Sequence, residues 1–327
     1  MAKDAFNDEA KTYTIGDLKL AIRDQQLSLV KEILASRQVT DIDEMDAASW
    51  TPLLQAVATG NRDIVAALID GGARVNAPEP SMGHTPLSRA VSGWYGGKPA
   101  MVSLLLSRGA DPNILPINPG EGPLLSAAEK GYETIMLMLL GKGAAIEQED
   151  TWGKTAIHVA AEHGQAAIIR ILAEHGAELD KLGALALSKA ISAHSREAFD
   201  ALIECGANPL APLRGRKTLL MVAAETGVTG VMPVLVEKGV DLDCADENGK
   251  TALMLAAEAG ISESVRKLLA LGANPALTTP DGKTARQLAE EAGHDHILYT
   301  IDNAPRKDAP ASTRPFRIKL AAKNGFA

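Results

Sequence analysis

Apolar residues recur along most of the chain at spacings of three and four residues, in short segments that end at glycine. Two such segments read TPLLQAVATG and RDIVAALIDGGA, over residues 51–60 and 62–73. This spacing predicts a pair of amphipathic helices, and the glycines mark their C-terminal ends. Because neither helix is long enough to be stable alone, each pair must bury its apolar faces against neighbouring pairs.

The same pair of segments recurs in register down the chain. Each unit has an alanine five residues after its opening residue and a glycine 21 residues after it, as in Thr51, Ala56 and Gly72. Seven units follow this frame, one of them three residues longer; they open at Thr51, Thr85, Gly122, Thr155, Leu185, Thr218 and Thr251. An atypical unit aligned by Ala21 precedes them, and another opened by Thr284 follows. We therefore predict an all-α solenoid over residues 14–302, with seven full repeats and two capping units.

The repeated unit closely resembles the ankyrin repeat. The resemblance is clearest in DTWGKTAIHVAAEHGQAAIIRILAEHGAELD, residues 150–180, and DENGKTALMLAAEAGISESVRKLLALGANP, residues 246–275. It implies an ankyrin-repeat solenoid of stacked helix pairs, with short hairpin-like fingers along one edge. It also implies a concave face, made by the fingers and the first helix of each pair, that meets protein partners.

Composition narrows the class of protein. The chain is 46% apolar but only 3% aromatic, so its core must be mostly aliphatic. No run of about 18 apolar residues is present, and the charged start MAKDAFNDEAKTY lacks the apolar stretch of a signal peptide. We expect no membrane span and a cytoplasmic protein, with a secreted effector as the alternative. A net charge of -8 argues against nucleic acid or anionic lipid as the partner.

Residues able to carry chemistry are few. The sequence has no P-loop, nucleophile elbow or HExxH motif, and its glycines are accounted for by turns and helix ends. The two cysteines, Cys205 and Cys244, lack metal-ligand spacing, and the histidine pairs at 158 and 163 and at 294 and 296 lack a third ligand. Since the repeats leave no room for a catalytic domain, we predict a non-enzymatic protein without cofactor or metal.

Departures from the repeat frame indicate where a partner binds. The predicted partner-binding residues are Trp50, Met82, His84, Trp94, Tyr95, Glu121, Trp152 and Lys154. We favour contact for Trp94 and Tyr95, which lie between glycines in the inserted turn 92–100. Trp50 and Trp152 either contact the partner or pack on the next finger, and we leave both alternatives open.

Two linkers also depart from the frame. The linker 111–122 is four residues longer than usual and contains three prolines, which stiffen it. Three residues are missing between Gly176 and Leu185, which predicts the loss of a fingertip and an interruption of the finger row.

Two rows of charge also follow the repeat. Glutamates stand seven residues after the opening residue of five units, at Glu129, Glu162, Glu225, Glu258 and Glu291. Lysines stand one residue before it in four units, at Lys154, Lys217, Lys250 and Lys283. The stack should align each row as a stripe. Such a stripe either steers a charged partner or is a solvated surface.

Both ends of the chain lie outside the repeats. We expect a flexible leader over residues 1–13 and a flexible basic tail over residues 303–327. Between Ala304 and Ala327 there are six basic residues and one acidic residue. The stretch RPFRIKL alternates apolar and basic side chains with the period of a strand, at Phe316, Arg317, Ile318, Lys319 and Leu320. This stretch docks on the acidic body, adds to a sheet edge of a partner, or has no binding role.

These observations favour a non-enzymatic module for protein–protein interaction, an adaptor or an inhibitor that occludes its partner. Its binding surface is expected on the concave and finger face of the N-terminal half. One alternative is a translocated effector that acts on a host protein, with the basic tail as an export element. Another is a regulatory subunit that a partner enzyme needs for activity.

Overall fold

The computed structural model describes residues 12–47, 49–93, 97–117 and 122–303. These residues form eighteen α-helices, two short 3-10 turns and no strand. The helices follow one another as nine pairs: α1 (Ile15–Arg23) and α2 (Leu27–Ser36), α3 (Pro52–Thr59) and α4 (Arg62–Asp70), α5 (Pro86–Ser92) and α6 (Pro99–Ser107), α7 (Pro123–Lys130) and α8 (Glu133–Leu140), α9 (Ala156–Glu162) and α10 (Ala166–Glu174), α11 (Leu179–Ser192) and α12 (Arg196–Glu204), α13 (Leu219–Thr226) and α14 (Met232–Glu237), α15 (Ala252–Glu258) and α16 (Ser262–Leu271), α17 (Ala285–Glu291) and α18 (Asp295–Asp302).

Local signals set where the first helix of each pair begins. The hydroxyl of Thr51 accepts a hydrogen bond from the N–H of Leu54 at 3.2 Å, which satisfies one of the free donors of the first turn. The same cap recurs at Thr85, Thr218, Thr251 and Thr284. Three of these helices have proline as their first residue, where no N–H is needed: Pro52, Pro86 and Pro123.

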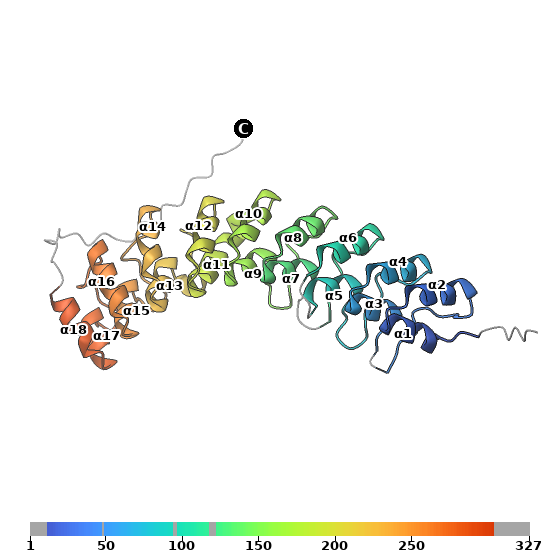
Figure 1. Ribbon diagram of the computed structural model, residues 1–327. Coiled ribbons are helices and arrows are strands. Elements are labelled where there is room, and N and C mark those ends of the chain that lie inside the picture. The colour runs from blue at the N-terminus through green and yellow to red at the C-terminus, as the bar shows by residue number, and fades with distance from the viewer. Residues whose placement is uncertain (1–11, 48, 94–96, 118–121, 304–327) are drawn as a thin grey trace, which may run out of the picture.

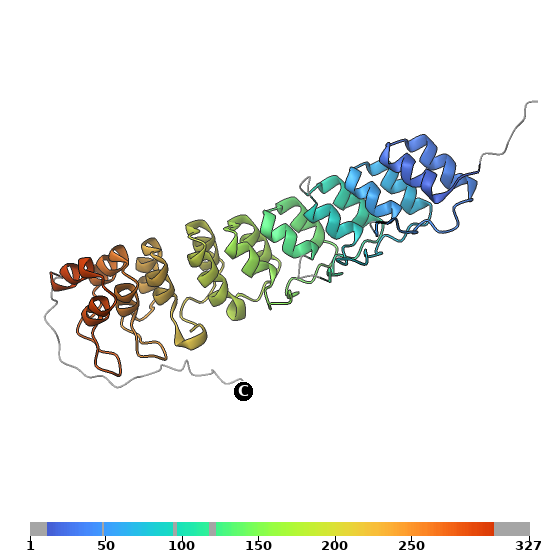
Figure 2. The same cartoon turned by 90° about the horizontal axis from the view of Figure 1, so that it is seen from below.

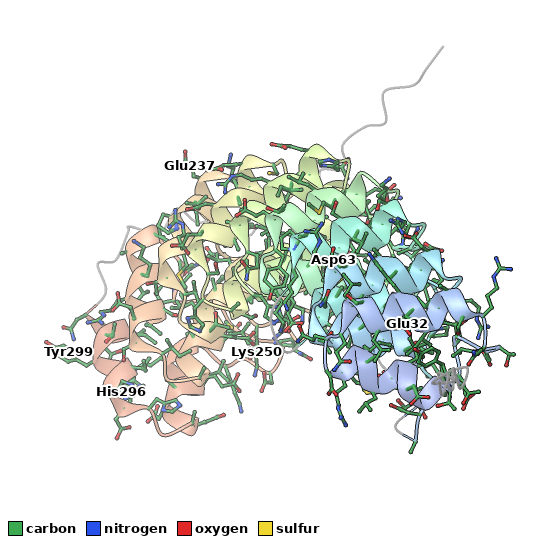
Figure 3. The ribbon with its side chains drawn as sticks, turned by 45° about the vertical axis from the view of Figure 1, so that its right-hand side comes forward. Glu32, Asp63, Glu237, Lys250, His296 and Tyr299 are labelled. Carbon is green, nitrogen blue, oxygen red and sulfur yellow. The ribbon has the colours of Figure 1, made fainter. Side chains whose placement is uncertain are left out.

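The pairs stack into one elongated, curved solenoid of two helical layers (Figure 1). The first helices of the pairs, with odd numbers, form one layer, and the second helices form the other (Figure 1). The segments between pairs project from one edge of the stack (Figure 2). In Figure 3, Glu237 marks a second helix, α14, and Lys250 marks a finger, and the two residues lie at opposite edges of the stack. The predicted all-α solenoid is confirmed.

The core runs the length of the stack between the two layers. Its buried side chains are almost all leucine, isoleucine, valine, alanine and methionine, and Phe199 of α12 is the single aromatic side chain among the described buried hydrophobic residues. Small alanines on the first helices let the layers approach closely, since Ala56, Ala127, Ala160 and Ala256 are fully buried. The core is therefore aliphatic, as the composition predicts.

The sixth pair lacks the finger that should precede it, as the shortened linker predicts, and its first helix is longer than those of the other pairs. Helix α11 has 14 residues and begins at Leu179, so helix occupies the place of a finger. Gly183 lies where α11 crosses the turn before the next finger: a Cβ at this glycine would come within 2.8 Å of the Cβ of Ala207. The finger row is thus divided into an N-terminal part of four fingers and a C-terminal part of three.

Candidate functional site

The four fingers of the N-terminal half form the candidate site. We call them the N-terminal finger row, and they comprise residues 39–50, 74–84, 111–122 and 145–154, of which 48 and 118–121 lie outside the described part. Each finger joins the second helix of one pair to the first helix of the next. The described parts of the fingers lie side by side along one edge of the stack (Figure 2).

A turn at the tip holds the fourth finger in shape. There the N–H of Asp150 donates to the carbonyl of Lys154 at 2.9 Å. The carboxylate of Asp150 accepts from the N–H groups of Trp152 and Lys154, both at 2.8 Å. Asp246 does the same in a C-terminal finger, with the N–H groups of Asn248 and Lys250. These two tips are therefore hairpins that hold a side chain in a fixed position.

A ladder of side chains joins each finger to the next unit. Asn76 accepts from the N–H of Asp111 at 2.8 Å and donates to the carbonyl of Gly109 at 3.1 Å. Asn113 makes the equivalent pair of bonds one unit further on. Carboxylates of Asp43, Glu147 and Asp243 accept from the backbone of the following unit at the same position. This ladder fixes the spacing of the fingers.

Three successive fingers each expose one apolar side chain. Met82, Ile117 and Trp152 are 45%, 70% and 67% exposed, and 35 residues separate each from the next. The N–H of Ile117 donates to the carbonyl of Met82 at 2.8 Å, which brings two of these tips together. Gly83 permits the approach, because its φ of +73° suits glycine and a Cβ there would come 2.7 Å from the nitrogen of Ile117. The exposed tips form an apolar stripe.

Trp50 has a different environment from Trp152. Its ring is half-buried beneath the guanidinium of Arg89, 5.1 Å from the ring centroid. Arg89 also forms a salt bridge at 2.8 Å with Glu79, whose side chain is only 2% exposed. The structure thus supports packing on the next unit for Trp50. Trp152 projects into solvent.

Two other predicted site residues lie close to helix N-termini. His84 is 6% exposed, with its Nδ1 3.4 Å from the hydroxyl of Ser88, so it lies below the surface rather than on it. Lys154 is half-exposed and donates to Glu162 at 2.8 Å. Trp94, Tyr95 and Glu121 lie outside the described residues, as does the tail segment 316–320.

The two charged rows pair with each other. In four units the lysine before the opening residue bonds the glutamate eight residues later: Lys154 with Glu162, Lys217 with Glu225, Lys250 with Glu258 and Lys283 with Glu291. The Lys154 ammonium lowers the pKa of Glu162, and Glu291 raises the pKa of Lys283. The lysines and glutamates of these four units therefore form neutral pairs rather than two separate stripes of opposite charge.

No cluster of three or more potential metal ligands occurs among the described residues. His158 is buried at the start of α9, where its Nδ1 accepts from the N–H of Thr155 at 3.2 Å, and burial lowers the pKa of its imidazole. Across the described ranges, no helix has both the length and the apolar character to cross a membrane.

Sequence reasoning missed the side-chain ladder and one of the three exposed tips. Ile117 was not among the predicted site residues: it lies five residues before Gly122, whereas Met82 and Trp152 lie three before Thr85 and Thr155, so the repeat frame does not mark it. The ladder did have a signal, because an asparagine or acidic residue recurs eight or nine positions before the opening residue of successive units.

A family model described as "Ankyrin repeats (3 copies)" matches residues 18–115, 124–213 and 210–279. Among solved structures, the fold is similar to the human ASB11 ankyrin repeat domain, with a TM-score of 0.59 and 24% identity. That similarity covers 70% of this chain and all of the other.

Relatives extend the same similarity to several kinds of protein. "Ankyrin repeat and KH domain-containing protein mask-1" of Caenorhabditis elegans is 32% identical over 59% of the chain, which spans 7% of that relative's length. Human "Cyclin-dependent kinase inhibitor 2A" is 32% identical over 38% of the chain and 76% of its own length. A "Putative ankyrin repeat-containing protein" of Treponema pallidum is 33% identical over 40% of the chain and 43% of its own length.

Proposed function

The chain belongs to the ankyrin-repeat family, and from this membership we propose that it is a non-enzymatic, cytoplasmic module that binds a protein partner through the N-terminal finger row. The partner lies across the concave face and the fingertips. A repeat scaffold has no intrinsic target, so the surface rather than the fold selects the partner. The predicted contacts at Trp94, Tyr95 and Glu121 belong to this proposal.

The apolar stripe of Met82, Ile117 and Trp152 carries the proposal. Met82 and Trp152 lie three residues before Thr85 and Thr155, and Ile117 lies five before Gly122. Three residues before Thr218, Thr251 and Thr284, the C-terminal half has Gly215, Asn248 and Asp281. Exposed apolar side chains on rigid supports at successive positions are suited to a protein interface, because a partner can bury all of them with little loss of conformational entropy. This contrast favours the N-terminal half.

Within this function, an occluding inhibitor or an adaptor fits best. One relative, matched over 76% of its own length, is by name an inhibitor of a kinase. A repeat scaffold can block a partner's active surface by binding over it, and this needs no catalytic residues. An effector that acts on a host protein and a regulatory subunit would use the same surface, and they differ from an inhibitor in what the bound partner then does.

Affinity capture from the native cell tests the proposal. The tagged full-length chain is compared with the triple variant Met82→Ala/Ile117→Ala/Trp152→Ala, and bound proteins are identified by mass spectrometry. Loss of one aromatic and two aliphatic anchors should weaken binding by about 3 kcal/mol or more, roughly a hundredfold. The variant should keep its helical circular dichroism, because these side chains are exposed.

Leu210→Ala/Tyr299→Ala is the matched control. Both side chains are large and exposed, at 55% and 75%, and both lie in the C-terminal half, with Tyr299 at the far end of the stack (Figure 3). The control should retain the partner. If the control loses the partner while the triple variant keeps it, the binding surface lies in the C-terminal half and the proposal is wrong. Activity of the partner with and without the chain then separates an inhibitor from a regulatory subunit.

A further inference from the structure

The two parts of the finger row differ in charge as well as in apolar exposure. The N-terminal finger row has ten acidic residues and two basic ones. The three C-terminal fingers, residues 208–217, 241–250 and 274–283, have five of each. The two basic residues of the N-terminal row are themselves paired, Arg74 with Asp43 and Lys154 with Glu162. The excess of acid therefore lies in the first, third and fourth fingers of the row, while the second finger, with Arg74 and Glu79, is balanced.

Several of these acids are available to a partner. The carboxylates of Glu44 and Glu149 are exposed and form no salt bridge within the described ranges. Asp111 is also exposed, and one of its oxygens accepts from the N–H of Asn113. Glu149 lies three residues before the exposed ring of Trp152. Such a surface fits a segment that carries basic and apolar side chains together.

One finger of the C-terminal half is also acidic, but it differs from the N-terminal finger row. Residues 241–250 contain four acids, but Asp246 is buried and burial raises the pKa of Asp243. Its tip is Asn248, and the preceding finger carries Arg214, Arg216 and Lys217. Exposed acid and exposed apolar residues therefore occur together in the third and fourth N-terminal fingers, as Asp111 with Ile117 and Glu149 with Trp152, and not in this finger.

The chain contains a segment of the complementary chemistry. In Arg314 to Leu320, three basic and three apolar side chains occupy seven positions with no acid. Fully extended, such a segment spans about 20 Å. Two steps between neighbouring fingers, from Met82 to Trp152, cover about 18 Å at the usual spacing of packed helices. Charge, apolar content and length all match.

The distances favour binding of this segment by the fingers of another molecule. Asn303 ends the described chain in the ninth pair, four steps or about 36 Å from the finger of Trp152 and six steps or about 54 Å from that of Met82. Thirteen residues lead from Asn303 to Phe316, and they span about 45 Å at full extension. Within one copy the segment would reach the row only as a nearly taut chain, which costs conformational entropy. A second copy has no such restriction.

We propose that the N-terminal finger row binds residues 314–320 of a second copy of this chain, so that copies associate head to tail. This inference rests on the proposed function, because it uses the same finger row. It assigns that surface a self-derived ligand that competes with any other protein partner. The contact is heterologous, since the tail and the fingers are different surfaces, and further copies can add at both ends.

Sedimentation velocity of the full-length chain tests the proposal. At ~50 mM salt, the average sedimentation coefficient should rise with protein concentration, and at ~0.5 M salt it should stay near the monomer value, because screening weakens exposed charge pairs. The tail variant Phe316→Ala/Arg317→Gln/Lys319→Gln and the finger variant Met82→Ala/Glu149→Gln/Trp152→Ala should each associate at least tenfold more weakly. The control Glu247→Gln, in the acidic C-terminal finger, should associate as the parent does.

A mixing experiment separates head-to-tail contact from other modes. The tail variant keeps intact fingers, and the finger variant keeps an intact tail. Mixed in equal amounts, they should form a one-to-one dimer that does not grow, although neither associates alone. A dimer that fails to appear in the mixture overturns the proposal, and so does a finger variant that associates as strongly as the parent.

Binding of a synthetic peptide of residues 310–323 separates the other possible sites of the tail. If the full-length chain stays monomeric at every concentration and binds the peptide only after the tail substitutions are made, the tail occupies its own fingers and the second-copy proposal is wrong. If neither self-association nor peptide binding occurs, the tail has another role, such as addition to a partner's sheet edge. Partner capture by the tail variant would then still support the proposed function, so the two failures are distinguishable.

Discussion

Removing Arg89 alone should strongly destabilise the N-terminal finger row, because Arg89 pairs with the buried carboxylate of Glu79. Arg89 is 20% exposed and Glu79 only 2% exposed, with 2.8 Å between them. Arg89 also lies over the ring of Trp50, so it joins the first finger to the second. The substitution Arg89→Leu keeps a side chain that can pack on the indole, and it leaves the carboxylate of Glu79 buried without its cation.

The magnitude follows from that burial. Breaking a buried ion pair by removing one partner costs about 3–5 kcal/mol, because the remaining charge is uncompensated. The hydroxyl of Ser81, 2.7 Å from Glu79, is the remaining donor to this carboxylate and offsets only part of the cost. Loss of the cation–π contact adds about 0.5–1 kcal/mol. We expect Arg89→Leu to lower the free energy of unfolding by about 4 kcal/mol.

Urea unfolding followed by circular dichroism measures this loss, and Arg170→Leu provides the matched control. Arg170 bonds Glu204 at 2.7 Å, but both side chains are about half exposed, so removal of this arginine should cost far less stability than Arg89→Leu. Hydrogen exchange should place the effect of Arg89→Leu in α3 to α6, because a stack transmits instability mainly to neighbouring units.

The double variant Glu79→Gln/Arg89→Leu completes the cycle. It leaves no charge buried, so it should recover much of the stability that Arg89→Leu loses. If Arg89→Leu costs no more than Arg170→Leu, or if the double variant is less stable than the single one, then burial of Glu79 does not control the stability of this finger.

Three further outcomes are expected. The substitution Gly183→Ala should lower stability by about 1–3 kcal/mol despite the higher helix propensity of alanine, since its Cβ would meet Ala207; urea unfolding measures this. Removing one charged pair with Lys217→Ala should cost about 1 kcal/mol or less in the same assay, because both partners are about one-third exposed. Burial lowers the pKa of His158, so the folded state favours the neutral ring; stability should fall as pH drops below about 6.5, where the unfolded chain takes up the proton first. The variant His158→Gln should lose less stability between neutral and acid pH, measured by thermal unfolding, and glutamine can replace the cap, as Gln287 does at Thr284.

The helix pairs could be predicted because their signals are local. A threonine caps a helix through the N–H three residues later, and glycine ends it within the last turn, so both act inside one short segment. The 33-residue interval between the last units then shows that the segments stack, since no single pair can bury its own apolar face. The aliphatic core follows from the same argument and from the scarcity of aromatic residues.

The surface was less predictable, because it depends on contacts between units. Lys154 and Glu162 stand eight residues apart, and only the path of the finger back to its helix brings them to 2.8 Å. The shortened linker before Leu185 indicates that a finger is lost, but not that α11 extends into its place. That outcome requires Gly183 to pack against Ala207 of a neighbouring turn.

Trp50 and Trp152 show which properties follow from the sequence and which depend on tertiary contacts. The sequence by itself determined the repeats, the helices and the finger in which each ring lies. It left open what surrounds each ring. The tertiary structure decided this: the guanidinium of Arg89, 39 residues after Trp50, covers that ring, while Trp152 stays 67% exposed. The physical reason is that exposure depends on what the next unit places beside a residue, and a local pattern does not contain that information.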